Sequence, residues 1–171
     1  MQKTYLCIDL KSFYASVECV ELGLDPFKVN LVVADPTRGG GAITLAATPA
    51  VKKLGVSSRG RIFEIDPKIE YMITPPRMHL YMEYSCKVYK VFLEFIAKED
   101  IHVYSIDESF LDVTSYLKLY QVNAKELAKK MLDRIYEKTG LTAQCHLVKN
   151  ISFVKKAINY DSLFCVMCRI I

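Results

Sequence analysis

Hydrophobic positions recur with two different spacings along the chain, which predicts a mixture of strands and helices. Short apolar runs that end at acidic or turn residues are typical of buried strands. Longer stretches repeat their apolar positions every three to four residues, as amphipathic helices do. The predicted strands cover residues 4–10, 30–34, 42–46, 62–65, 69–73, 102–106 and 109–113, and the predicted helices cover residues 12–22, 48–55, 78–96 and 124–139.

This order of elements predicts an α+β fold with a mixed or antiparallel sheet and packed helices. Local signals support the helix ends: Ser12 and Thr48 are candidate N-caps, and Asn123 begins a capping-box pattern. The glycines at 39–41 are interpreted as a hairpin loop, because no Gly-Lys-Ser/Thr phosphate-binding sequence follows them. We find no internal repeat and no low-complexity linker.

Asp107 and Glu108 stand at the join between the last two predicted strands, and Asp9 stands at the end of the first. An Asp-Glu pair in a turn is most often only a solvated turn. Two carboxylates held close together repel each other by about 4 kcal/mol at about 4 Å, so such a pair favours a bound cation or a raised pKa. If the first strand lies beside this hairpin, the three carboxylates meet at one edge of the sheet.

Three carboxylates at one point would suit Mg²⁺, which prefers oxygen ligands and retains waters and phosphate oxygens. Two such ions can stabilise the attacking and leaving oxygens of a nucleotidyl transfer. In this interpretation Asp9 and Asp107 bridge two Mg²⁺ ions, for which Mn²⁺ could substitute. Glu108 holds the ion nearer the attacking hydroxyl, and the backbone carbonyl of Leu10 is a further ligand.

Composition allows an ordinary globular domain, or a domain with a small inserted lobe. The chain has 171 residues and a net charge of +4, which permits a phosphate-bearing partner without requiring one. Its six cysteines are scattered, and we interpret them as reduced thiols of a cytoplasmic protein. Cys165 and Cys168 have metal-ligand spacing but no second pair, and His146 is the nearest histidine, so a zinc site is not favoured. No signal peptide or membrane-spanning segment is predicted.

Two long acidic motifs resemble those of the Y-family translesion DNA polymerases. They are IDLKSFYASVE at residues 8–18 and SIDESFLD at residues 105–112. The intervening sequences LVVAD at 31–35 and KKLGV at 52–56 are also similar to that family. The resemblance is to the UmuC-like ImpB/MucB/SamB branch and covers about residues 3–142. Both motifs occur in order, about a hundred residues apart, which makes the resemblance specific.

The resemblance implies template-directed addition of deoxynucleotides opposite damaged DNA. It implies a palm domain formed by residues 1–10 and 78–171, and a fingers insertion at residues 11–77. The metal ligands would be Asp9, Asp107 and Glu108. The implied partners are a DNA primer–template and a deoxynucleoside triphosphate, with a sliding clamp or SOS accessory proteins as further candidates.

The resemblance also implies nucleotide contacts within residues 11–77. Tyr14 occupies the steric-gate position, where an aromatic ring under the sugar excludes the ribose 2′-hydroxyl, and Phe13 lies beside it. Lys52 falls at a position where relatives carry a basic triphosphate contact. Thr48, one helical turn earlier, either caps its helix or touches phosphate. Pro49 cannot supply the phosphate-binding side chain that some relatives carry near this position.

The C-terminal part of the sequence departs from the family pattern. His146-Leu147-Val148 replaces a Gly-x-Gly-like turn, although Asn150 and Lys155 keep the family's spacing and make Lys155 a candidate triphosphate lysine. Residues 162–171 are apolar and unlike the family. The thumb and little finger are expected to be absent, and we interpret the chain as a truncated or frame-disrupted product. Apolar surface left by the missing lobes would favour self-association.

Three hypotheses remain open. The chain is either a polymerase catalytic fragment, or a non-catalytic palm/fingers module that binds nucleotide or a protein partner, or another palm-like two-metal enzyme such as a nucleotide cyclase. Phe13, Tyr14 and the two long motifs argue against the third.

Overall fold

The computed structural model describes residues 3–149 and divides the chain into two compact units. Unit 1 contains the chain up to Leu10 and from Ser85 onward, and unit 2 contains Lys11–Tyr84. The division falls inside helix α3 (Met78–Leu93), whereas the sequence analysis places it ahead of that helix. The assignment of these units as palm and fingers stays a prediction.

Unit 1 is built on a four-stranded antiparallel sheet in the order β5-β6-β1-β7. Its strands are β1 (Tyr5–Leu10), β5 (Ile101–Val103), β6 (Glu108–Asp112) and β7 (Ala143–Val148). Its remaining elements are the later part of α3, η3 (Lys98–Asp100), α4 (Thr114–Leu119) and α5 (Ala124–Thr139). The predicted first strand therefore lies beside the strand that carries Glu108, which is the arrangement that the three-carboxylate hypothesis requires.

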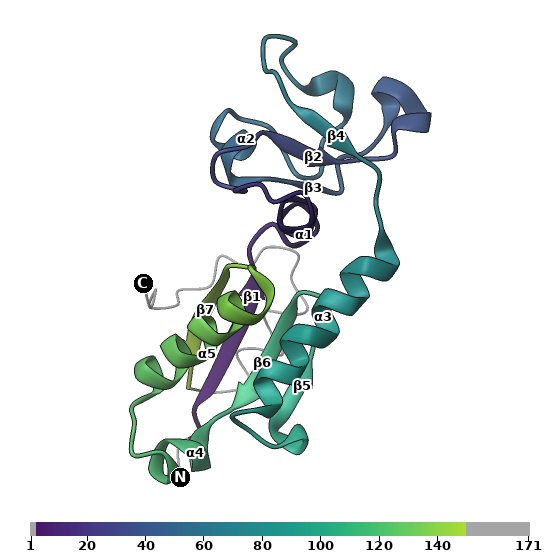
Figure 1. Ribbon diagram of the computed structural model, residues 1–171. Coiled ribbons are helices and arrows are strands. Elements are labelled where there is room, and N and C mark those ends of the chain that lie inside the picture. Colours follow the sequence, from purple (N-terminus) through teal and green to yellow (C-terminus); the bar gives the residue numbers. More distant parts are fainter. Residues whose placement is uncertain (1–2, 150–171) are drawn as a thin grey trace. The chain divides into compact units, whose positions relative to one another are not determined.

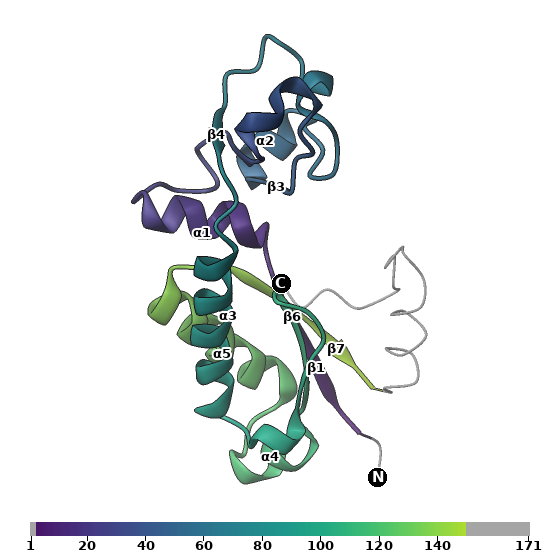
Figure 2. The same ribbon diagram turned by 90° about the vertical axis from the view of Figure 1, so that its right-hand side faces the viewer.

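Helices cover one face of this sheet. Figure 2 shows α3 and α5 on the same side of strands β6, β1 and β7. Side chains alternate between the two faces of a strand, so Leu6, Ile8 and Leu10 point together toward the helices. All three are buried, and Ile8 and Leu10 line a small cavity with Val88 and Phe92 of α3. The apolar stripe predicted for α3 thus packs on the sheet.

The α5 helix follows its sequence signals closely. The Asn123 side chain accepts a hydrogen bond from the Glu126 N–H, and the Glu126 carboxylate accepts one from the Asn123 N–H, which forms the predicted capping box. Gly140 ends the helix with a φ of 70°, a conformation that favours glycine. Leu127, Met131 and Ile135 form its buried face.

Unit 2 contains a small three-stranded sheet in the order β3-β2-β4, visible in Figure 1. Strand β2 (Leu31–Val33) pairs antiparallel with β3 (Ala46–Ala47) and parallel with β4 (Met72–Thr74). The helical elements are α1 (Phe13–Glu21), η1 (Pro36–Gly41), α2 (Pro49–Lys53), η2 (Ile62–Glu64) and the first turns of α3. The two sheets and their separate helices confirm the α+β class.

Several sequence predictions about unit 2 are wrong in detail. Residues 36–41 form a 3-10 helix, and the strand predicted at 42–46 is reduced to β3 and an isolated bridge at Ile43. Residues 62–64, predicted as strand, form a 3-10 helix, because the Glu64 side chain caps the Arg61 N–H. Ser12 stands at the N-cap position of α1 but makes no side-chain capping bond.

Unit 1 also departs from the prediction at one connection. Helix α4 follows β6 directly and was not predicted, since its six residues are too few to display a helical period. Within residues 3–149, no helix has the length and apolar character that a bilayer crossing requires.

Candidate functional site

Asp9 lies in the middle of a row of three polar side chains on one face of the unit 1 sheet. In the register of the sheet, Asp9 pairs with Glu108 on β6 and with Gln144 on β7. Directly paired residues of antiparallel strands share a face, so all three side chains lie on the face opposite Leu6, Ile8 and Leu10. The Gln144 side-chain amide donates a 2.8 Å hydrogen bond to Oδ2 of Asp9.

Asp107 is adjacent in the backbone, but its side chain takes a different direction. Its carbonyl oxygen accepts a 3.0 Å hydrogen bond from the Leu10 N–H, which fixes the two peptides side by side. Its carboxylate accepts a 2.7 Å hydrogen bond from the Ser105 hydroxyl. Asp107 also lines the small cavity beside Ile8 and Leu10, on the helix side of the sheet.

Glu108 has a buried thiol as its neighbour. The Cys7 Sγ donates a hydrogen bond of 3.4 Å to Oε1 of Glu108. Burial, reinforced by the negative charge of Glu108, raises the pKa of the Cys7 thiol far above its ordinary value, so the thiol stays protonated and acts as a donor. Each of the three acids therefore accepts from a neutral donor, and none of these donors cancels its charge.

The donor chemistry of this edge suits a hard divalent cation, since carboxylate and carbonyl oxygens are the ligands that Mg²⁺ prefers. Asp9 and Glu108 fit such an ion as neighbours on one face. Asp107 would have to turn away from Ser105 to join them. Among residues 3–149, no group of three His, Cys, Asp or Glu side chains lies close enough to hold one ion. The three-carboxylate metal site and the Leu10 carbonyl ligand stay predictions.

The predicted nucleotide-contacting aromatics lie in unit 2. Phe13 and Tyr14 begin α1, with ring centroids 5.6 Å apart. The Tyr14 ring stacks on Tyr81 of α3, with centroids 4.4 Å apart and planes inclined by 13°. The Tyr81 hydroxyl donates a 2.7 Å hydrogen bond to the buried carboxylate of Glu18.

Glu18 is held by two elements at once. Besides Tyr81, Arg77 donates two hydrogen bonds to its carboxylate, from Nε at 3.1 Å and from a terminal nitrogen at 2.6 Å. The sequence analysis missed Glu18, Arg77 and Tyr81 as supports of Tyr14. The relevant signal is the acid within the apolar pattern of α1, since an acid facing a core requires a partner.

Lys52 and Thr48 sit at opposite ends of α2. The Lys52 ammonium donates a 2.9 Å hydrogen bond to the hydroxyl of Ser12, whose φ of 49° lies in the left-handed region. The Thr48 hydroxyl caps α2 by accepting from the Val51 N–H, and it donates to the Val29 carbonyl. Thr48 is fully buried, so the geometry supports its capping role. Contact of Thr48 or Lys52 with phosphate stays a prediction.

Two features named in the sequence analysis lie outside the described residues: Lys155 with its companion Asn150, and the Cys165/Cys168 pair. Gln144 is described but was not predicted as part of the site. Recognition of residues 143–148 as the second neighbour of β1 would have identified it.

Comparison with known proteins gives a consistent picture. The model of the impB/mucB/samB family matches residues 8–158. The putative UV-damage repair protein UvrX of Bacillus subtilis is 37% identical over 164 residues, which cover 94% of this chain and 38% of UvrX. DNA polymerase IV 2 of the same organism is 34% identical over 160 residues, covering 91% of this chain and 37% of that protein. The chain thus spans well under half the length of these two relatives.

A shorter relative and a solved structure complete the comparison. The DNA repair protein homolog YozK of Bacillus subtilis is 42% identical over 109 residues, which cover 62% of this chain and 93% of YozK. A Y-family DNA polymerase chimera of Dbh and Dpo4 matches with a TM-score of 0.73 and 26% identity, covering 86% of this chain and 43% of the chimera.

Proposed function

The chain belongs to the impB/mucB/samB family, and from this membership we propose that it is the catalytic part of a DNA polymerase for translesion synthesis. Its reaction would be the template-directed addition of deoxynucleotides opposite damaged bases, with release of pyrophosphate. Relatives of the chain carry the names of a putative UV-damage repair protein, UvrX, and of DNA polymerase IV 2, which supports this proposal.

The pairing of Asp9 with Glu108 across β1 and β6 carries this proposal. It brings together acids that lie about a hundred residues apart, one from each family motif. Asp107 follows the same hairpin and is linked to β1 through the Leu10 N–H. Two carboxylates on neighbouring strands repel each other, and a bound divalent cation would relieve this repulsion.

Each predicted site residue has a role in this proposal. Asp9, Asp107, Glu108 and the Leu10 carbonyl would hold two Mg²⁺ ions. When bound, the ions lower the pKa of the attacking hydroxyl and stabilise the negative charge of the transferring phosphoryl group. Tyr14, held against Tyr81, would exclude ribonucleotides by occupying the space of the 2′-hydroxyl.

The remaining residues would bind the nucleotide. Phe13 would contact the sugar and base, and Lys52, Lys155 and Thr48 would contact the triphosphate. A lysine offers phosphate a single point charge, without the paired geometry of arginine. The hydrogen bond between Lys52 and Ser12 supports the assignment of Lys52, because it holds the ammonium beside the first turn of α1, whose N–H groups favour anions.

The decisive experiment combines nucleotide binding with primer extension. Mn²⁺ or Mg²⁺ with a deoxynucleoside triphosphate should raise the melting temperature of the wild-type chain, and Asp107→Ala should abolish that shift. Primer extension on a template with one damaged base then tests the reaction itself. A shift that survives Asp107→Ala contradicts the metal-site assignment, whereas nucleotide binding without extension at high protein concentration contradicts polymerase activity.

A second candidate function is a non-catalytic module that binds nucleotide or a protein partner. The direction of the Asp107 side chain, toward Ser105 and away from the Asp9–Glu108 face, favours it. The match also covers 93% of YozK, so at least one relative consists almost entirely of the region that it shares with this chain. Extension activity of the isolated chain would exclude this alternative.

The proposal also covers the cellular location, the metal and the partners of the protein. We infer a cytoplasmic repair protein that acts in the SOS response, uses magnesium, and works with a sliding clamp or SOS accessory proteins on a DNA primer–template. Self-association is a further expectation, because many large apolar side chains of unit 2 are exposed.

A further inference from the structure

The segment at residues 42–46 of unit 2 buries its small side chains and exposes its large ones. Ala42, Thr44 and Ala46 are buried, whereas Ile43 and Leu45 between them are 48% and 47% exposed. Burial of a large apolar side chain is worth about 1.5–3 kcal/mol, so the hydrophobic effect alone would favour the opposite orientation. Exposure of the large apolar side chains in place of the small ones indicates that this surface binds a partner.

A second segment extends the same surface. Ile43 pairs with Arg61 in an antiparallel bridge, flanked by hydrogen bonds from Thr44 to Gly60 and from Ile62 to Ala42. Paired residues share a face, so the Ile43 and Arg61 side chains are neighbours. Phe63 follows two residues later and is 68% exposed. We call Ile43, Arg61 and Phe63, together with the exposed Arg59 two positions before Arg61 in the sequence, the arginine–aromatic face.

The backbone at Gly40 lies close to Phe63. A methyl group placed on Gly40 would lie 3.5 Å from the Phe63 Cβ, so the 3-10 helix η1 is in contact with the base of this side chain. The helix η1 thus supports the base of the Phe63 side chain, while the side chain as a whole remains 68% exposed to water. An exposed aromatic ring of this kind offers a flat surface of about the size of a pyrimidine base.

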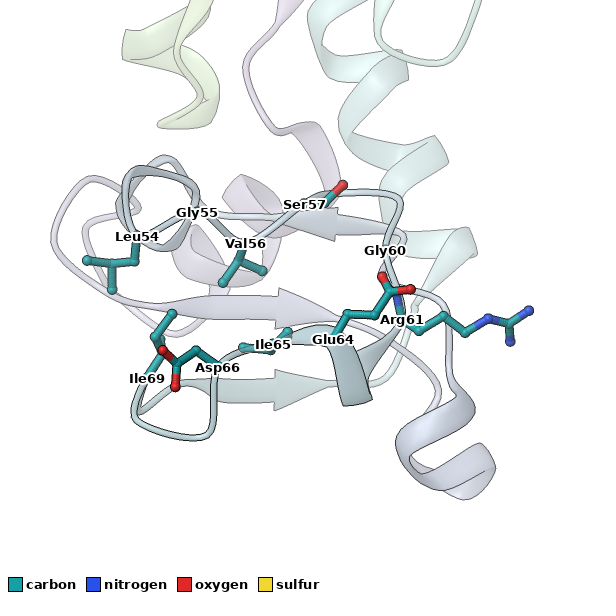
Figure 3. Close-up of a pocket in the computed structure, with 10 residues that line it drawn as sticks. All are labelled: Leu54, Gly55, Val56, Ser57, Gly60, Arg61, Glu64, Ile65, Asp66 and Ile69. Carbon is teal, nitrogen blue, oxygen red and sulfur yellow. The ribbon is translucent and has the colours of Figure 1, made fainter.

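The two arginines give this face a net positive charge, although the Glu64 carboxylate lies beside Arg61 and accepts a 2.9 Å hydrogen bond from the Arg61 N–H. The Arg61 guanidinium donates a 2.7 Å hydrogen bond to the Gly41 carbonyl, which orients the group without neutralising it. Figure 3 shows the Arg61 side chain extending away from the adjacent cavity of about 280 Å³, whose apolar wall includes Val56 and Ile65. Arg59 is exposed, and within residues 3–149 neither arginine forms an ion pair.

We propose that the arginine–aromatic face binds an unpaired DNA strand, with one base stacked on the ring of Phe63 and neighbouring phosphates on Arg59 and Arg61. Stacking on an exposed aromatic ring beside cationic side chains is the usual way in which proteins hold single strands without reading their sequence. An unpaired strand fits better than a duplex, because paired bases cover their own faces. The choice of DNA rests on the proposed function.

A second copy of the chain fits this face poorly. A two-fold contact centred on this face would bring the arginines of one copy close to those of the other, and like charges oppose association. The face thus favours an anionic occupant over itself.

Tryptophan substitution gives a direct test, because the chain contains no tryptophan. Phe63→Trp places a single indole on the face, and Phe27→Trp is the matched control at another exposed phenylalanine of unit 2, 42% exposed. A fluorescent 16-mer oligodeoxythymidine serves as the probe, in EDTA and without nucleotide, so that failure of metal binding or polymerisation cannot affect the result. We expect quenching of the indole at position 63 on binding and little change at position 27.

Affinity measurements complete the test. In fluorescence anisotropy, Phe63→Ser should weaken binding about tenfold, the range of one lost base stack, whereas Phe27→Ser should leave it unchanged. Arg61→Gln should reduce the slope of log K against log salt by about 0.7, the value for one phosphate contact on a single strand. Lys68→Gln, at another exposed cation of unit 2, is its control.

An unquenched indole in the Phe63→Trp variant, together with unchanged affinity of Phe63→Ser, would overturn the proposal. If instead the wild-type chain sediments as a dimer and Phe63→Ser as a monomer, with equal oligonucleotide affinity, the face belongs to a second copy. Single-strand binding without primer extension would uphold this inference and reject only the polymerase activity.

Discussion

The side-chain amide of Gln144 donates a hydrogen bond of 2.8 Å to the carboxylate of Asp9. The two residues pair directly across β1 and β7, so the contact is fixed by the register of the sheet and not by a flexible loop. The amide engages Oδ2 and thereby restricts the rotation of the carboxylate. Gln144 is in this respect a positioning residue for the acid that begins the candidate metal site.

We therefore expect Gln144→Leu to weaken Mn²⁺ binding about tenfold, as loss of an outer hydrogen bond to a metal ligand commonly does. Titration of Mn²⁺, followed by its electron paramagnetic resonance signal, measures the affinity. Asp9→Asn should remove most of the binding, and Asp133→Asn, on the exposed side of α5, should leave it unchanged.

A double-mutant cycle separates positioning from general damage. In the Asp9→Asn background, Gln144→Leu should have little further effect, because its partner charge is already gone. If Gln144→Leu weakens Mn²⁺ binding by the same factor in the wild-type and Asp9→Asn backgrounds, Gln144 acts independently of Asp9.

Tyr14 provides a test of nucleotide selection. Its ring stacks on Tyr81 and is held in one orientation. If this ring excludes the 2′-hydroxyl, Tyr14→Ala should reduce the preference for deoxynucleotides over ribonucleotides by about tenfold or more, as loss of a steric barrier does. Affinities for the two triphosphates, obtained by thermal shift, give this ratio even if extension is slow.

The matched control is Tyr136→Ala, which removes a 60% exposed tyrosine from α5. It should leave the ratio unchanged. Equal preference in wild type and Tyr14→Ala would assign Tyr14 a packing role only.

Elements with local signals were predictable from the sequence. The apolar run of β1, the capping box at Asn123 and the Thr48 cap depend on residues within a few positions of one another. The pairing of β1 with the acidic hairpin was stated only as the condition for bringing the acids together, and the structure shows that pairing. These predictions succeeded because short-range energetics and the final fold agree.

The failures arise where a specific polar contact, local or long-range, outweighs the preference that the hydrophobic pattern displays. Residues 62–64 have strand-forming side chains, but the Glu64 cap on Arg61 turns them into a 3-10 helix. Ser12 has the side chain of a cap but a left-handed backbone, and its hydroxyl accepts from Lys52, forty positions away. Gln144 was not predicted because its contact with Asp9, 135 positions away, depends on the order of the strands in the sheet.

The buried carboxylate of Glu18 should be one of the most sensitive positions of unit 2. It is 2% exposed and accepts hydrogen bonds from Arg77 and Tyr81. Glu18→Ala would leave the buried Tyr81 hydroxyl without its acceptor and would remove the ion pair with Arg77, whose side chain is 45% exposed and can be solvated. We therefore expect Glu18→Ala to lower the free energy of unfolding by about 2 kcal/mol. Urea denaturation measures this change.

Two companion variants calibrate the result. Tyr81→Phe removes one hydrogen bond and should cost about 1 kcal/mol. Glu83→Ala, at an exposed position of α3, should stay within about 0.5 kcal/mol of wild type. A Glu18→Ala variant as stable as Glu83→Ala would contradict the inferred importance of the buried Glu18 carboxylate.

Alkaline pH should destabilise the chain through Tyr84. Burial, with the hydrogen bond that its hydroxyl donates to Glu21, raises the pKa of Tyr84 to about 12. An unfolded tyrosine has a pKa near 10, so the folded state binds the proton more tightly. The resulting stabilisation is fully present below about pH 10 and is lost as the pH rises toward 12.

Tyr84→Phe should therefore be less stable than wild type at neutral pH but should lose stability less steeply between pH 10 and 12. The slope will not vanish, because burial also raises the pKa of Tyr81. Urea denaturation at several pH values measures both curves, with Tyr71→Phe as the control at a half-buried tyrosine of the same unit. Parallel curves for wild type and Tyr84→Phe would mean that Tyr84 ionises equally well in the folded and unfolded states.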